Sequence, residues 1–264
     1  MARQKLGQHF LRARHILERI AAAACPQPVP LCIEIGPGEG ALTKHLLPRA
    51  GRLVAIELDG SLAARLQARF SGASALTVVA ADALEVDLSQ WGQAVIAGNL
   101  PYYAATALIE RALAAGPIRA VFLVQKEVAA RLAARPGSRD YGYLSVSIQC
   151  VAEVEILCRV PPGAFSPPPK VDSAVIRLTP RDRWRELGIA DSAAFLRFAR
   201  ACFRQKRKTL RNNLAGLYPR PLLDRLPEMA RRAEQLSIED FARLYSIFGT
   251  ISSGGSAHAD TGTS

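Results

Sequence analysis

Short apolar runs alternate with amphipathic helical stretches through roughly the first half of this 264-residue chain. Runs of four to eight apolar residues are typical of buried strands, whereas apolar residues three or four apart are typical of helices. Strands that alternate with helices form a parallel, doubly wound sheet with right-handed crossovers, so the pattern predicts an α/β fold. We expect strands at 31–35, 52–56, 76–79, 94–97 and 120–124, and helices at 16–24, 42–49, 62–70, 106–114 and 128–134.

The pattern changes in the C-terminal half. Two further strands, 153–157 and 174–178, have no helix between them, which indicates an antiparallel edge to the sheet. A linker-like stretch at 179–183 is followed by helical stretches at 192–203, 206–217, 221–226 and 238–248. We therefore expect three regions: residues 1–180 as the α/β domain, 181–251 as a small basic helical domain, and 252–264 as a disordered tail.

The charge of the chain points to a polyanionic partner. The net charge is +11 and the pI about 9.9, values that are typical of nucleic-acid binding, although a generally basic solubilising surface is the simpler alternative. Five scattered cysteines without a C-x-x-C pair argue against a disulfide framework and a metal site. No apolar run approaches the roughly 20 residues that span a bilayer. We expect a cytoplasmic protein without a membrane partner.

A glycine-rich stretch, residues 34–41, follows the first strand and opens a helix. Its glycines, Gly36 among them, allow a tight turn and close approach of the backbone to a ligand. The stretch also fits the dinucleotide fingerprint, so it does not specify the cofactor. Glu57 closes the second strand and suits a ribose diol, while Asp82, just after the third, suits an adenine amine. The alternative for both acids is that they cap helix starts.

The stretch Asn99-Leu100-Pro101-Tyr102 follows the fourth strand. Ligands of open α/β sheets bind at the carboxyl ends of the strands, which is where this stretch lies. A plain strand-to-helix turn is the alternative, because Asn and Pro are common in turns.

A run of cations without any acid lies in the C-terminal region. On the predicted helix 206–217 and just before it, helical spacing puts Arg204, Lys208 and Arg211 on one face with Arg207 beside them. A solvated face would mix signs, so this run predicts contacts with nucleic-acid phosphates. The candidate nucleic-acid-binding residues are Arg204, Lys206, Arg207, Lys208 and Arg211.

Together these stretches resemble a known family. Residues 34–40, 57–59, 82–84 and 99–102 resemble the class I S-adenosylmethionine-dependent methyltransferases that act on adenine amines. More narrowly, residues 5–11, 124–128, 165–173 and 204–213 resemble the small-subunit (16S) rRNA adenine dimethyltransferases. The resemblance covers about residues 3–250. One departure is His9, where the family usually has asparagine.

The resemblance implies a Rossmann-like methyltransferase domain that binds S-adenosylmethionine. The cofactor contacts it implies are His9, Leu11, Gly36, Glu57, Asp82 and Asn99. The implied catalytic residues are Asn99, Leu100, Pro101 and Tyr102. In this scheme the Asn99 side-chain oxygen and the Leu100 carbonyl accept hydrogen bonds from the adenine amine, and Pro101 stiffens the turn. Tyr102 and Phe165 would stack on a flipped-out base, although Phe165 is equally well explained as a core aromatic.

The resemblance also implies the substrate: two adjacent adenines in a hairpin loop near the 3′ end of 16S rRNA, in the small ribosomal subunit or its precursor, modified by a monomeric enzyme. A large-subunit rRNA methyltransferase of the antibiotic-resistance type shares the glycine stretch and the Asn-x-Pro-Tyr pattern. A ribosome-assembly factor that acts mainly by binding is an alternative of another class. A DNA adenine methyltransferase is disfavoured because no separate base-reading domain is apparent.

Overall fold

The structure, a computed structural model, describes residues 9–254 and divides into two compact units. Of the described residues, unit 1 contains those up to Ala133 together with Ala152–Arg181, and unit 2 contains Ala134–Val151 together with those from Asp182 onward. Segment 134–151, which the sequence prediction assigned to the first domain, belongs to unit 2. Its residues Tyr141, Val146 and Cys150 are buried in the same apolar cluster as Phe195.

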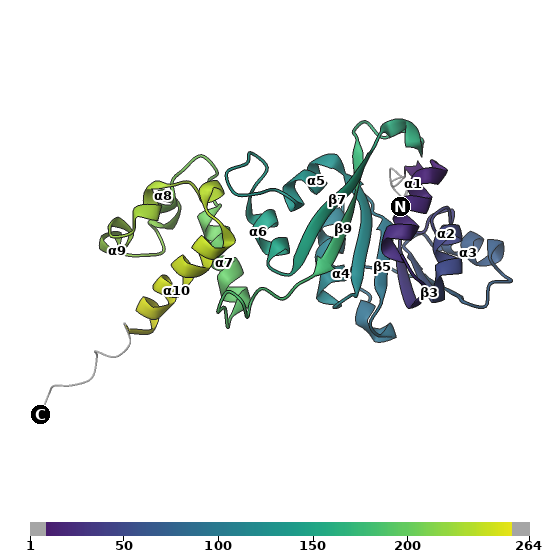
Figure 1. Cartoon of the computed structure of the whole chain (residues 1–264), viewed down its shortest axis with the longest axis horizontal. Helices are drawn as coiled ribbons and strands as arrows, with labels where there is room; N and C mark the ends of the chain where they lie inside the picture. Colours follow the sequence, from purple (N-terminus) through teal and green to yellow (C-terminus); the bar gives the residue numbers. More distant parts are fainter. Residues whose placement is uncertain (1–8, 255–264) are drawn as a thin grey trace, which may run out of the picture. The chain divides into compact units, whose positions relative to one another are not determined.

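Unit 1 is built on a seven-stranded sheet with the strand order β4-β3-β2-β5-β6-β9-β7 (Figure 1). The first five strands in this order are parallel, and β9 is antiparallel to both β6 and β7. The predicted doubly wound sheet with an antiparallel edge is confirmed. The strands are β2 (Val29–Ile35), β3 (Ala50–Glu57), β4 (Leu76–Ala80), β5 (Val95–Asn99), β6 (Arg119–Gln125), β7 (Ala152–Val160) and β9 (Ser173–Pro180).

Helices link and cover these strands. The helix α1 packs on β5 and β6 through the apolar side chains of Ile16, Leu17 and Ile20, which recur at the spacing of one helical face. The helix α3 packs on β3 and β4, and α4 on β6. The helical elements of unit 1 are α1 (Arg14–Ala24), α2 (Thr43–Leu46), η1 (Leu47–Arg49), α3 (Gly60–Arg69), η2 (Leu88–Trp91), α4 (Ala105–Ala114), α5 (Lys126–Leu132) and η3 (Pro162–Ala164).

A second, two-stranded sheet ties the N-terminal segment to a distant part of the chain. The strand β1 (Phe10–Leu11) pairs antiparallel with β8 (Phe165–Ser166). The backbone N–H groups of Arg12 and Ala13 extend this pairing, because both donate to the carbonyl of Ala164. This pairing fixes the position of the N-terminal segment, which matters for the site described below.

Unit 2 is helical and has an aromatic core. Phe195, Phe198, Phe241 and Phe248 are buried in it and lie 4.2–6.4 Å, centroid to centroid, from neighbouring aromatic rings. The last helix begins with a capping box, in which Ser237 and Asp240 each accept from the other's backbone N–H. The elements are α6 (Tyr143–Gln149), α7 (Ser192–Cys202), α8 (Leu210–Leu214), α9 (Arg220–Asp224), η4 (Pro227–Ala230), η5 (Ala233–Gln235) and α10 (Ile238–Gly254).

The predicted helix 206–217 is wrong in extent. Its helical part is α8 alone, and residues 204–208 form turns between α7 and α8. The buried side chain of Asn213 imposes this path: its oxygen accepts from the N–H of Gln205, and its nitrogen donates to the carbonyls of Cys202 and Gln205. These bonds replace the backbone bonds that a continuous helix would make. The cations of residues 204–208 therefore lie on a loop, and the predicted helical face does not exist.

The end of the described chain also differs from the prediction. Helix α10 runs to Gly254, past the start of the predicted tail at 252, and residues 255–264 lie outside the described residues. Within residues 9–254, no helix is long and apolar enough to cross a bilayer.

We predict that Gly98→Ala destabilises the fold. A Cβ on Gly98 would lie inside van der Waals contact of the Ile35 carbonyl oxygen, because β5 runs beside β2 there, and such overpacking costs about 1–3 kcal/mol. The free energy of unfolding in urea measures this. Gly72→Ala is the control, because its Cβ would meet no atom within 4 Å. Equal stability of the two variants would contradict the packing described for these strands.

Candidate active site

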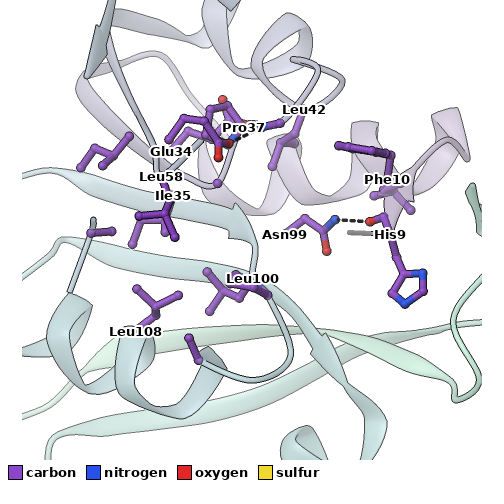
Figure 2. Close-up of a pocket in the computed structure, with 18 of the residues that line it drawn as sticks. His9, Phe10, Glu34, Ile35, Pro37, Leu42, Leu58, Asn99, Leu100 and Leu108 are labelled. Atoms are coloured by element: carbon purple, nitrogen blue, oxygen red, sulfur yellow. Dashed lines mark hydrogen bonds between the residues drawn. The ribbon is translucent and has the colours of Figure 1, made fainter. Parts of the chain in front are cut away.

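A cavity of about 400 Å³ opens at the carboxyl ends of the parallel strands (Figure 2). It lies where β2 has β3 on one side and β5 on the other, the point at which the strand order reverses. Open α/β sheets bind their ligands at this point, and the volume lies in the range of small-molecule sites. The lining comes mainly from residues 34–39 and 41–42 at and after the end of β2, 56–58 at and after the end of β3, 81–84 after β4 and 99–104 at and after the end of β5, with 9–12 of the N-terminal segment.

The glycine stretch lines this cavity and is covered by the N-terminal segment. Gly38 has a φ of +56°, and a Cβ on it would lie 3.0 Å from the ring of Phe10. The side chain of Arg12 also pairs with Glu39 at 2.6 Å. Through both contacts the N-terminal segment covers the glycine stretch. His9, Leu11 and Gly36 all line the cavity.

The carboxylate of Glu57 is buried at the end of β3 and holds the glycine stretch in place. One oxygen accepts from the N–H of Gly38 at 2.9 Å and the other from the N–H of Asp59 at 3.0 Å. The cap of helix α3 is Asp59, whose side chain accepts from Ser61 and Leu62. Glu57 is therefore no helix cap, and each of its oxygens retains acceptor capacity toward the cavity.

Asp82 also lines the cavity, and it caps a turn, because no helix begins directly after it. One of its carboxylate oxygens accepts from the N–H of Leu84 at 2.8 Å, which forms an Asx turn. Leu58 and Leu84 line the same cavity and are 47% and 37% exposed. These two apolar side chains, which the sequence reasoning did not single out, provide flat apolar surface beside the two acids.

The side chain of Asn99 has a defined orientation. Its amide nitrogen donates to the carbonyl of His9 at 3.1 Å, and Figure 2 shows the amide oxygen turned away from that contact. A carbonyl can only accept, so this bond identifies which end of the amide is nitrogen. The next residue, Leu100, is fixed by its N–H, which donates to the carbonyl of Leu123 at 3.1 Å.

Tyr102 is held by the first residue of β9, and its neighbour His9 by the proline-rich segment 167–169 that precedes β9. The Tyr102 hydroxyl lies 2.6 Å from that of Ser173, a buried residue. Partial burial raises the pKa of Tyr102, so its hydroxyl stays protonated at neutral pH. His9 Nδ1 donates to the carbonyl of Pro167 at 2.9 Å, and the rings of His9 and Tyr102 lie 5.9 Å apart. The side chain of His9 thus contacts the proline-rich segment.

The structure does not bring Phe165 into the cavity. Its side chain is only 5% exposed and lies in the core of unit 1, beside Leu11 across the β1–β8 pair. This position fits the alternative of an ordinary core aromatic. Stacking on a base would require the ring to leave the core.

Glu34 is a buried acid at the base of the cavity that the sequence reasoning did not assign a role. The Thr43 hydroxyl donates to its carboxyl group at 2.6 Å. Burial raises the pKa of Glu34 to about 8, and the nearby Glu57 acts in the same direction. Glu34 is therefore mainly protonated at neutral pH. Among the residues that the structure describes, no group of three or more His, Cys, Asp or Glu is placed to hold a metal ion.

The cations predicted to bind RNA lie in unit 2, where a second cavity of about 560 Å³ occurs. Lys206 and Arg207 line it, together with two arginines that the sequence reasoning missed, Arg139 and Arg232. The ammonium of Lys206 donates to the carbonyl of Arg139, which joins the two loops. Arg211 instead pairs with Asp224. Arg204 and Lys208 are exposed on the loop.

The sheet order, the glycine stretch at the strand reversal and the Asn-Leu-Pro-Tyr turn define a Rossmann-like methyltransferase. A sequence profile described as ribosomal RNA adenine dimethylase matches residues 1–249. A "Ribosomal RNA small subunit methyltransferase A" from Acidobacterium capsulatum is 46% identical over 91% of this chain and 89% of that protein. One from Xanthomonas euvesicatoria is 44% identical, over 93% and 96%. The chain belongs to the ribosomal RNA adenine dimethylase family.

Solved structures of similar proteins support the same family and fold. A dimethyladenosine transferase from Plasmodium falciparum superposes with a TM-score of 0.77 at 25% identity, over 93% of this chain and 98% of that one. The 23S rRNA methyltransferase ErmE superposes with a TM-score of 0.70 at 30% identity, over 90% and 98%. The expected enzyme class, an rRNA adenine dimethyltransferase of Rossmann-like fold, is confirmed.

We predict that Glu34→Gln flattens the dependence of stability on pH. The folded protein keeps the Glu34 proton up to a pH of about 8, whereas the unfolded chain releases it near 4.5. The free energy of unfolding therefore falls as pH rises between these values, by at most about 1.4 kcal/mol per unit. Gln keeps an acceptor for Thr43 and has no proton to lose. Urea unfolding at several pH values measures this, with the exposed Glu153→Gln as control; an unchanged slope in Glu34→Gln would contradict a protonated Glu34.

Proposed function

We propose that this enzyme transfers methyl groups to the exocyclic amines of two adjacent adenines in a hairpin loop near the 3′ end of 16S rRNA. The small-subunit substrate is supported by relatives named for that subunit at 44–46% identity, against 30% for a large-subunit enzyme. The observation that carries the adenine-amine chemistry is the orientation of the Asn99 amide. Its nitrogen is engaged by His9, so its oxygen serves as the acceptor.

The two acceptors at the turn activate the amine. An adenine amine is a poor nucleophile because its lone pair is delocalised into the ring. The Asn99 oxygen and the Leu100 carbonyl accept hydrogen bonds from its two N–H groups. These hydrogen bonds favour a pyramidal nitrogen whose lone pair faces the methyl donor. The nitrogen then forms a bond to the methyl carbon and loses one proton to solvent. Holding the amine in this geometry is a matter of orientation, which lowers barriers strongly.

S-adenosylmethionine, the cofactor, supplies the methyl group from a sulfonium centre, which leaves as a neutral thioether. The residues of the cavity fit it: Glu57 offers its remaining acceptor capacity to a ribose diol, and Asp82 offers an acceptor to the adenine amine. Because the cofactor is cationic at sulfur, the +11 charge of the chain serves another partner.

Asn99→Ala should abolish most of the transfer and weaken cofactor binding much less, because the amide oxygen acts on the amine in the transition state. Single-turnover rates on unmethylated small subunits and calorimetric cofactor affinity measure the two effects. Gln93→Ala, an exposed amide outside the cavity, is the control. A variant that keeps more than about a tenth of the wild-type rate would remove Asn99 from the mechanism.

We further propose that the enzyme acts as a monomer in the cytoplasm and contacts rRNA phosphates through unit 2. Lys206, Arg207, Arg139 and Arg232 line one cavity with a single acid, Glu234. Such a concentration of cations attracts phosphates, and the release of counterions makes the affinity salt-dependent. Arg211, paired with Asp224, contributes less to this surface than the loop cations.

Reversing Lys206 and Arg207 to Glu should weaken binding to small subunits and flatten its dependence on salt. Each lost phosphate contact lowers the slope of log K against log salt by about 0.9. Binding at several salt concentrations measures the slope. The control reverses Arg52 and Arg65, two exposed arginines of unit 1, which changes the net charge equally. An equal loss of slope in both double variants would indicate a general charge effect and contradict a specific surface.

A role in assembly by binding alone is the second candidate, favoured by this basic cavity. The variant Asn99→Ala distinguishes methyl transfer from a role in assembly, because it should lose transfer and retain binding to small subunits. If the catalytically inactive variant supports subunit maturation as well as the wild type does, binding is the main function.

A further inference from the structure

Tyr103 is a large aromatic side chain exposed at the cavity. It is 70% exposed, whereas its neighbour Tyr102 is half-buried. Among the described residues, seven large apolar side chains are exposed, and three of them line this one cavity: Leu58, Leu84 and Tyr103. The two leucines follow β3 and β4, beside the acids assigned to the cofactor. Tyr103 follows β5 and adjoins the catalytic turn, which associates it with the substrate.

The backbone around Tyr103 is fixed. The N–H of Ala104 donates to the carbonyl of Pro101 at 3.1 Å, which closes a β-turn with Tyr102 and Tyr103 at its two central positions. The ring of Tyr102 is tied at its hydroxyl to Ser173. Helix α4 begins at Ala105 and anchors the other end of the turn. Tyr103 therefore projects from a rigid support, and little conformational freedom is lost when a ligand settles on it.

The substrate has a chemical group that matches this position. An RNA whose adenine enters the cavity and stacks on Tyr102 leaves the adjacent base at the mouth, unstacked from its neighbour. The exposed ring of Tyr103, the residue after Tyr102, offers that base a new stacking partner. Stacking of one base on an aromatic ring typically stabilises binding by about 1–3 kcal/mol. We propose that Tyr103 is a second base-binding position. One adenine of the pair stacks on Tyr103 while the other, in the cavity, is methylated. This inference rests on the proposed function.

Such a position serves both adenines of the pair. Stacking on an aromatic ring tolerates any base, because every base has a π face. When the second adenine enters the cavity, the first can occupy Tyr103 whether or not it carries methyl groups. Tyr103 is thus a substrate-positioning residue for each transfer.

The test measures kcat/KM on unmethylated small subunits with labelled S-adenosylmethionine for Tyr103→Ala, Tyr103→Leu and Tyr103→Phe. We expect a loss of about 5- to 150-fold for Ala, a similar loss for Leu, and near wild-type activity for Phe, which keeps the ring. Cofactor affinity by calorimetry should be unchanged in all three. Ile118→Ala, another exposed apolar residue of unit 1 that does not line the cavity, is the control.

A second substrate identifies what Tyr103 touches. In particles whose neighbouring adenine is replaced by uridine, a weaker stacker, the loss caused by Tyr103→Ala should shrink by at least half on a logarithmic scale. An equal loss on both particles would overturn the proposal in favour of another contact, such as a ribosomal protein. Full activity of Tyr103→Ala, or rescue by Leu as complete as by Phe, would also overturn it and leave the proposed function intact. A wild-type enzyme that labels no small-subunit adenine would refute the proposed function itself.

Discussion

The hydrogen bond from the Asn99 side chain to the His9 carbonyl connects the parts of the active site. It turns the amide oxygen away from His9, and it attaches the N-terminal segment to the end of β5. That segment is held in turn by the β1–β8 pair, and its Phe10 ring lies over Gly38. The turn Asn99–Tyr102, the glycine stretch and the N-terminal segment that covers it thus depend on one another. Loss of this bond would free the amide to rotate and to turn its nitrogen toward the cavity. That nitrogen only donates hydrogen bonds, so it could not accept one from an adenine amine.

Two carboxyl groups near the cavity have different roles because their surroundings differ. The carboxylate of Glu57 accepts hydrogen bonds from two backbone N–H groups, those of Gly38 and Asp59. Glu34 receives one hydroxyl in a fully buried position, and burial raises its pKa to about 8. The two neighbouring acids therefore differ, because only Glu34 is kept protonated by burial at neutral pH. The cations that give the chain its net charge of +11 include a concentration at the second cavity, in unit 2.

Most of the fold could be predicted from sequence because it depends on local patterns. Buried strands such as β2 and β5 are apolar runs, and the helices between them show one apolar face. The loop 204–208 could not be predicted, since it is set by Asn213, a polar side chain whose three hydrogen bonds depend on tertiary structure. Residue type alone also could not separate the buried Phe165 from the exposed Tyr103. Similarly, segment 134–151 joins unit 2 through a core that assembles only in three dimensions.

In the proposed mechanism, two acceptors at one turn activate an adenine amine and allow it to be methylated twice. Nucleoside analysis of 16S rRNA from unmethylated small subunits, over a time course with excess S-adenosylmethionine, tests this mechanism directly. We expect dimethyladenine to accumulate as the final product at two adjacent positions, with monomethyladenine only at early times if the RNA dissociates between transfers. A reaction that runs to completion and stops at monomethyladenine, or that modifies another base, would contradict it.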